Sequence, residues 1–82
     1  VADIDLSKVK TKKIFKWLKK NNIEEHEMLK TFNCGVGFCI IIDSKNLNKT
    51  RKFFTKKYKP YIIGKIIYGK DKVKLNKKID WS

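Results

Sequence analysis

The chain has 82 residues, 41% of them hydrophobic, and a formal net charge of +13 at pH 7. This length gives one small domain or part of one, with enough apolar residues for a core. A membrane-spanning helix is excluded, since no run of about 18 apolar residues occurs, and no secretory leader is recognisable, so we expect a cytoplasmic protein without a membrane partner.

The positive charge raises the possibility of a nucleic-acid partner. Arg51 is the single arginine among 21 basic residues, and the lysines are spread through every segment. Readers of DNA grooves and phosphates favour the planar fork of arginine, which lysine lacks. We therefore interpret the charge as compositional and do not expect nucleic acid to bind. A small basic nucleic-acid-binding module is kept as the alternative function.

The first elements predicted are a strand and a helix. Residues 1–6 alternate as in a half-buried strand. Thr11 is suited to cap a helix running from residue 12 to about 21. The core face of that helix is predicted to consist of Ile14, Phe15 and Leu18.

A second helix is predicted from residue 22 onward. Asn22 can cap it, and Glu25 can complete a capping box three residues later. Its apolar stripe comprises Met28, Leu29 and Phe32. Asn33 is then expected to take a left-handed conformation, and Gly35 can adopt positive φ without strain.

Residues 36–42 are apolar at every position and rich in β-branched side chains. This pattern predicts a central strand covered on both faces. A third helix is expected to follow, capped by Asp43 or Ser44 and ending near residue 57, before Pro60.

The last third of the chain is predicted to build a sheet. Residues 61–68 form a second two-faced apolar run, and Gly69, Lys70 and Asp71 form a turn. Residues 72–75 suit an edge strand guarded by lysines, with Val73 and Leu75 facing inward. Residues 76–82 are a polar tail that we expect to be flexible or docked through Trp81. The order β-α-α-β-α-β-β predicts an α+β fold with a mixed or antiparallel sheet.

Few residues carry recognisable chemistry. Gly35 and Gly37 could offer backbone N–H groups to a phosphate, but they follow a helix and precede a strand, the reverse of a P-loop. A turn glycine and a close-packing strand glycine are therefore the favoured interpretation. His26 could exchange a proton near neutral pH, yet no nucleophile is paired with it, so a solvated helix histidine is favoured.

The two cysteines, Cys34 and Cys39, are expected to be reduced thiols. Their odd spacing in an extended segment sends the side chains to opposite faces, which argues against a disulfide. One histidine and two such cysteines do not form a zinc site, so we expect no metal and assign no catalytic residue.

Three segments carry a resemblance to a known family. HEMLKTFNCGVG at residues 26–37 resembles a signature of aminoimidazole ribonucleotide synthetase, or phosphoribosylformylglycinamidine cyclo-ligase. The similarity extends through IFKWLKKNNIEE at residues 14–25 and through residues 61–67. That family is several times longer, so the resemblance concerns the last part of its C-terminal domain.

The resemblance implies part of an α/β/α C-terminal domain, with residues 1–82 forming a single partial domain. It implies an enzyme of purine biosynthesis that closes formylglycinamidine ribonucleotide with ATP. ATP and Mg would be held by the full-length enzyme, with no cofactor in this fragment, which we expect to be inactive alone. The implied substrate-cleft candidates are Asn33, Gly35, Gly37 and His26. The expected partners are the remainder of the same enzyme and, for the isolated chain, a second copy.

Overall fold

A computed structural model describes residues 1–70 and 72–82. Its strands are β1 (Ala2–Asp5), β2 (Gly64–Ile66) and β3 (Val73–Asn76). Its α-helices are α1 (Lys13–Lys20), α2 (Glu25–Thr31) and α3 (Leu47–Arg51), joined by the 3-10 turns η1 (Leu6–Lys8), η2 (Ser44–Asn46) and η3 (Lys56–Tyr58). The fold is α+β, as the sequence predicts.

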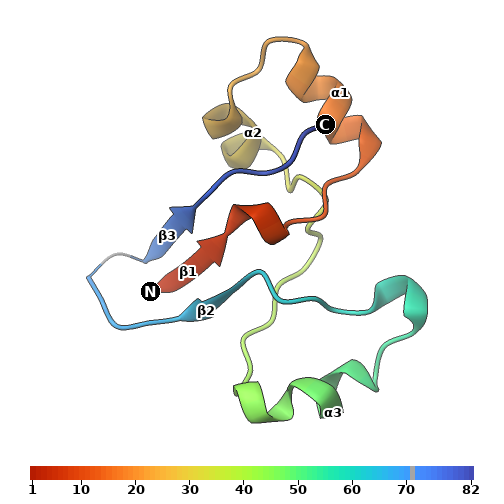
Figure 1. Ribbon diagram of the computed structural model, residues 1–82, viewed down its shortest axis with the longest axis vertical. Helices are drawn as coiled ribbons and strands as arrows, with labels where there is room; N and C mark the ends of the chain where they lie inside the picture. The colour runs from red at the N-terminus through yellow and green to blue at the C-terminus, as the bar shows by residue number, and fades with distance from the viewer. Residues whose placement is uncertain (71) are drawn as a thin grey trace.

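The strands form one mixed sheet in the order β2-β1-β3. β1 lies in the centre, antiparallel to β2 and parallel to β3 (Figure 1). The pairing with β2 continues past the strand ends. The Asp5 backbone N–H donates to the Ile63 carbonyl at 2.7 Å, and the Ile67 backbone N–H donates to the Val1 carbonyl at 2.8 Å. The N-terminal strand is therefore held on both sides by the last third of the chain.

The strand register gives the sheet two unlike faces. Ala2 pairs with Ile66 and with Val73, and Ile4 pairs with Leu75, so these side chains share one apolar face. The opposite face carries Asp3, Lys65 and Lys74. A sheet normally packs its apolar face against another layer. Here Ile66, Val73 and Leu75 are each more than half exposed.

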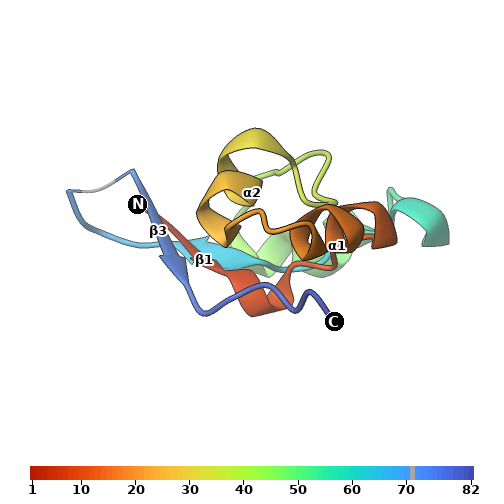
Figure 2. The same cartoon turned by 90° about the horizontal axis from the view of Figure 1, so that it is seen from above.

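The buried core sits at the end of β1 and not over either face of the sheet. It consists of Leu6, Val9, Met28, Cys34 and Ile79. These residues come from η1, from the segment after it, from α2, from the turn that follows α2 and from the chain after β3. The molecule is a flat slab with extents of 41 × 36 × 18 Å, and the helices border the sheet (Figure 2).

The caps predicted for the first two helices are wrong. Lys12 and Glu24 occupy the N-cap positions of α1 and α2, and neither makes a side-chain cap hydrogen bond. Asn22 has φ 64°, so it belongs to the turn that ends α1 and does not have the extended backbone that an N-cap needs. The Thr11 hydroxyl is buried without a hydrogen-bond partner among the described residues.

The third helix is shorter than predicted. Asp43 caps the 3-10 turn η2, which leads directly into α3, by accepting a hydrogen bond from the Lys45 backbone N–H at 3.1 Å. The α-helical part then ends at Arg51, and no residue of α3 is buried. A helix of this length is marginal without a packed face, and the lysines around it repel each other.

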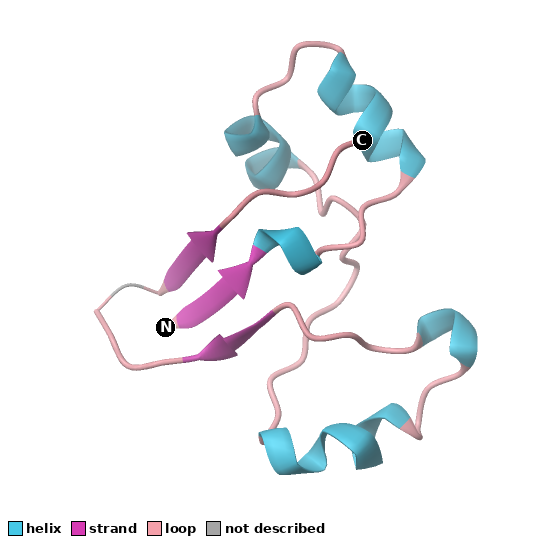
Figure 3. Ribbon diagram, viewed as in Figure 1, coloured by secondary structure: helices cyan, strands magenta, loops and turns pink. Residues whose placement is uncertain are grey.

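The central strand predicted at residues 36–42 is wrong, since the structure has no strand there. The segment runs as a loop from α2 to α3 (Figure 3), and Phe38 is 86% exposed and Ile41 78% exposed. Both edges of the true central strand, β1, are already paired, and within the described residues no helical layer covers the segment. A strand that is apolar on both faces requires two covering layers, and the described residues do not supply them.

The later strands are partly as predicted. β2 is shorter than the apolar run 61–68, and β3 is an edge strand as expected. The inward orientation predicted for Val73 and Leu75 is wrong, because they lie on the uncovered face.

The turn predicted at residues 69–71 includes Asp71, which lies outside the described residues. The observed order is β-α-α-α-β-β, and none of the described helices is long and apolar enough to cross a membrane.

Candidate functional site

The turn that follows α2 carries three of the four predicted cleft residues. The Asn33 side-chain oxygen accepts a hydrogen bond from the Gly35 backbone N–H at 2.8 Å, and the Asn33 carbonyl accepts one from Val36 at 2.9 Å. Left-handed backbone occurs at Cys34, with φ 53°, and at Gly35, with φ 101°. The prediction of positive φ at Gly35 is confirmed. The left-handed conformation predicted for Asn33 is wrong. Cys34, one residue later, takes it, and the Asn33 side chain accepts the Gly35 hydrogen bond that closes the turn.

The two glycines of the turn have different surroundings. A Cβ atom on Gly35 would lie 2.9 Å from the Lys10 carbonyl oxygen, so the turn packs directly on the segment before α1. A Cβ atom on Gly37 would meet nothing within 4 Å. The interpretation of Gly37 as a close-packing strand glycine is therefore wrong, since no strand and no neighbour surround it.

His26 is not brought together with the turn. It is exposed on the first turn of α2, whereas Asn33 is exposed beyond the end of the same helix. Seven residues separate them in sequence, which corresponds to roughly 10 Å along a helix axis. His26 thus lies near the start of α2, and the turn residues lie beyond its end.

Cys34 is a core residue and not a nucleophile. Its side chain is 2% exposed, and its thiol lies 3.5 Å from the Met28 carbonyl oxygen. Burial raises the pKa of the Cys34 thiol, and the nearby Glu25 carboxylate raises it further. A reactive cysteine needs the opposite environment. Both Cys34 and the exposed Cys39 are free thiols.

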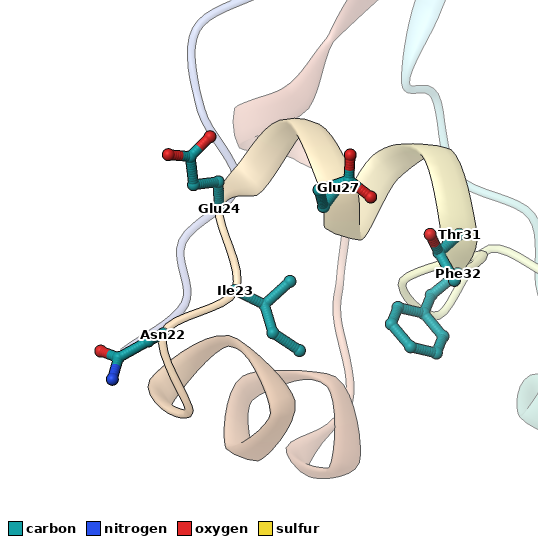
Figure 4. A pocket seen from close by; sticks show the side chains of 6 residues that line it. All are labelled: Asn22, Ile23, Glu24, Glu27, Thr31 and Phe32. Carbon is teal, nitrogen blue, oxygen red and sulfur yellow. The ribbon is translucent and has the colours of Figure 1, made fainter.

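The structure contains an open hollow of about 450 Å³ that the sequence interpretation missed. It lies between the α1–α2 loop and one side of α2 (Figure 4). Its lining residues are Asn22, Ile23, Glu24, Glu27, Thr31 and Phe32. None of the four predicted cleft residues lines it. Two glutamates give it negative charge, which does not suit a phosphorylated substrate.

A second hollow lies beside the sheet. It is lined by Asp3, Asp5, Lys8, Ile62, Gly64, Lys65 and Asn76. Ser7 donates a side-chain and a backbone hydrogen bond to Asp5, and these lower the pKa of the Asp5 carboxyl. Asp3 accepts a hydrogen bond from the Asn76 amide, and Asp5 pairs with Lys77 at 3.4 Å. The carboxylates are thus used in holding the strand ends together.

The residues present do not fit Mg–ATP. Within residues 1–70 and 72–82, no three His, Cys, Asp or Glu side chains gather closely enough to hold a metal ion. Gly35 and Gly37 follow the C-terminal end of α2, where the helix dipole is negative and disfavours a phosphate. We therefore derive no reaction step through ATP from this chain.

Comparison with known proteins finds a matching family and several similar relatives. Residues 1–76 match the family described as AIR synthase related protein, C-terminal domain. The chain is similar to phosphoribosylformylglycinamidine cyclo-ligase from Neisseria gonorrhoeae, with 39% identity over 56 residues, covering 67% of this chain and 16% of the relative. It is similar to the Staphylococcus carnosus protein of the same name, with 38% identity over 72 residues, covering 85% of this chain and 21% of the relative.

A third relative of that name, from Staphylococcus aureus, is 37% identical over 68 residues, covering 80% of this chain and 20% of the relative. The chain therefore spans about a fifth of the length of the curated relatives it matches. No solved structure matches it. The matched names are those of ligases and give no support to the alternative of a nucleic-acid-binding module.

Proposed function

Because the chain belongs to the family of AIR synthase related C-terminal domains, we propose that it works as part of a phosphoribosylformylglycinamidine cyclo-ligase. The observation that carries this proposal is the family match over residues 1–76, which includes the turn after α2. The proposed reaction closes formylglycinamidine ribonucleotide to aminoimidazole ribonucleotide with ATP in purine biosynthesis. The proposed location is the cytoplasm, where free thiols such as Cys34 and Cys39 stay reduced.

The proposed contribution of this chain is one wall of the substrate cleft. The turn offers an amide donor, because the exposed Asn33 side chain uses its oxygen to accept from Gly35 and its N–H₂ group can donate to a ligand. The Gly37 backbone lies in open space beside it. Such a donor can hydrogen-bond an uncharged acceptor, such as a carbonyl oxygen, of a substrate. His26 is a separate candidate at the other end of α2.

The proposed partner is the remainder of the same enzyme, which would supply the ATP and Mg sites. The uncovered sheet face and the exposed apolar segment 36–42 support this, since both present apolar side chains that a further layer would cover. Without that layer we propose that the chain self-associates through the same surfaces.

A chimeric enzyme tests the cleft-wall proposal. The matched segment of the S. carnosus cyclo-ligase is replaced by the corresponding residues of this chain, and ATP-dependent ring closure is measured. We expect activity to be retained. Asn33→Ala should then raise KM by up to roughly tenfold, as expected for one lost hydrogen bond. Asn48→Ala, on the exposed side of α3, is the matched control and should leave KM unchanged.

Two outcomes would contradict the proposal. A folded chimera without ring-closing activity would argue against the family role of this chain. Equal KM values for the Asn33→Ala and Asn48→Ala chimeras would remove the turn from the cleft, and a raised KM in His26→Ala would then move the contact to the start of α2. The 82-residue chain alone is expected to show no turnover with ATP and formylglycinamidine ribonucleotide.

A further inference from the structure

Residues 77–82, which follow β3, lie beyond the family match over residues 1–76. The chain turns at Lys77, which has φ 59°, and its ammonium lies 3.4 Å from the Asp5 carboxylate at the end of β1. The segment then runs toward α1, where the chain ends (Figure 1). Lys77 thus ties the start of this segment to the central strand.

The segment next enters the core. Ile79 is 4% exposed and belongs to the same buried cluster as Met28 and Cys34. Met28 lies on α2 and Cys34 in the turn that follows it. One side chain from outside the family match therefore completes the packing around the helix that carries the candidate turn.

The segment finally bonds to α2 itself. The Trp81 indole N–H donates to the Glu25 carboxylate at 2.9 Å, and this contact is partly buried. Glu25 is the first residue of α2 and lies close enough to Cys34 to influence its thiol. Hydrogen bonds to a charged acceptor are stronger than neutral ones, and partial burial increases the effect.

We propose that residues 77–82 form a clasp that fixes α2 and the Asn33–Gly35 turn against the end of the sheet and keeps Cys34 covered. One end of the clasp is tied to β1 through Lys77, and the other is tied to α2 through Trp81. Among the described residues, α2 makes no backbone hydrogen bond to a strand. Its position therefore depends on side chains, and the clasp supplies two of them. The inference rests on this packing and stands whether or not the chain has the proposed function.

The labelling rate of the Cys34 thiol tests the clasp. A Cys39→Ser background leaves Cys34 as the one thiol, and an aromatic disulfide reagent reports how often it becomes accessible. Trp81→Phe keeps an aromatic six-membered ring and removes the indole N–H donor, so labelling should accelerate by about tenfold. Trp17→Phe is the matched control, because Trp17 is 60% exposed on α1, and its rate should stay within about twofold of the parent.

Packing is tested in the same way. Ile79→Ala should accelerate labelling at least as much as Trp81→Phe, while Ile14→Ala, at a residue that is 57% exposed, should not. If Ile79→Ala fails to fold, Trp81→Phe alone decides, because it creates no cavity of comparable size.

Hydrogen exchange separates a local clasp from a general loss of stability. In Trp81→Phe, the backbone N–H groups of Met28 and Phe32 should exchange faster, and that of Asp5 in β1 should not. Equal Cys34 labelling in Trp81→Phe and Trp17→Phe would overturn the proposal. Faster exchange in α2 and β1 together would also overturn it, since the segment would then stabilise the whole molecule and not one helix.

Discussion

The conformational demands on single residues are sharpest at Gly35 and Gly64. Gly35 combines φ 101° with a close approach to the Lys10 carbonyl. Gly64 lies so close to β1 that an added Cβ would clash with the Asp3 carbonyl oxygen. One position requires glycine for its dihedral angle and its contact, and the other requires it for strand pairing alone.

Gly35→Ala is predicted to lower the free energy of unfolding by about 1 kcal/mol or more, because an alanine is strained at positive φ and meets Lys10. Gly37→Ala is the matched control, two residues away in open space, and should be neutral or slightly stabilising. Urea unfolding of both variants measures the difference. Equal midpoints for the two would contradict the strained turn.

The free energy of unfolding is predicted to depend on pH in the alkaline range because of Cys34. Burial, and then Glu25, raise the pKa of this thiol above its ordinary value of 9.0, so the folded state holds the proton more tightly than the unfolded chain. The contribution to stability is complete below the unfolded pKa and is lost as the pH rises through the folded pKa. The free energy of unfolding should therefore fall above about pH 9.

Urea titrations near neutral pH and above about pH 9 measure this loss. Cys39→Ser should retain it, because Cys39 is exposed, whereas Cys34→Ser should reduce it. An identical alkaline loss in both variants would assign the effect to other groups, such as the lysines and tyrosines.

Among the elements, α2 and the segment 36–42 differ most in their environment. Each contains large apolar side chains, yet Met28 of α2 is fully buried whereas Phe38 and Ile41 are 86% and 78% exposed. Met28→Ala is predicted to cost about 2–5 kcal/mol, and Ile41→Thr less than about 0.5 kcal/mol. Thermal or urea unfolding measures both. A cost for Ile41→Thr close to that of Met28→Ala would mean that the segment is a buried strand in solution.

The sequence predicts the elements well wherever local signals decide them. The strand at residues 1–6, both longer helices and the edge strand lie close to their predicted places, because periodicity and turn residues act locally. The predicted central strand does not form, because strand identity depends on what covers and pairs with it. The place of β1 between β2 and β3 depends on pairing across most of the chain, which no local pattern records.

The candidate site was predicted only in part from the sequence. Positive φ at Gly35 follows from its being glycine after a helix. The left-handed Cys34 was not foreseen, since cysteine seldom takes that conformation, and its thiol is held by contact with the Met28 carbonyl. The acidic hollow of Figure 4 was not predicted, although Glu24 and Glu27, three residues apart on one side of a helix, are a sequence signal for it.

At the scale of the whole molecule, the apolar sheet face is the main feature that lacks a partner. Its residues Ile66, Val73 and Leu75 are 54%, 56% and 51% exposed. Self-association through this face should tighten as salt is added, because the net charge of +13 repels a second copy until it is screened. Sedimentation at low and high salt measures the change.

A pair of variants decides whether that face is the contact. Leu75→Asn should weaken the association, while Lys74→Gln, on the opposite face of β3, should leave it unchanged or strengthen it by removing charge. A monomer at both salt concentrations, with no binding of a hydrophobic dye, would show that the face needs no cover.

The central place of β1 also has a consequence for the order of events during synthesis. β1 precedes both of its partner strands in the chain, and they come much later, as shown by the hydrogen bond between Val1 and Ile67, which are 66 residues apart. No part of the sheet can form until β2 has emerged, and the parallel pairing waits for β3. During synthesis β1 therefore stays unpaired until residues 64–66 have been made, and sheet formation becomes the slow, long-range step of folding.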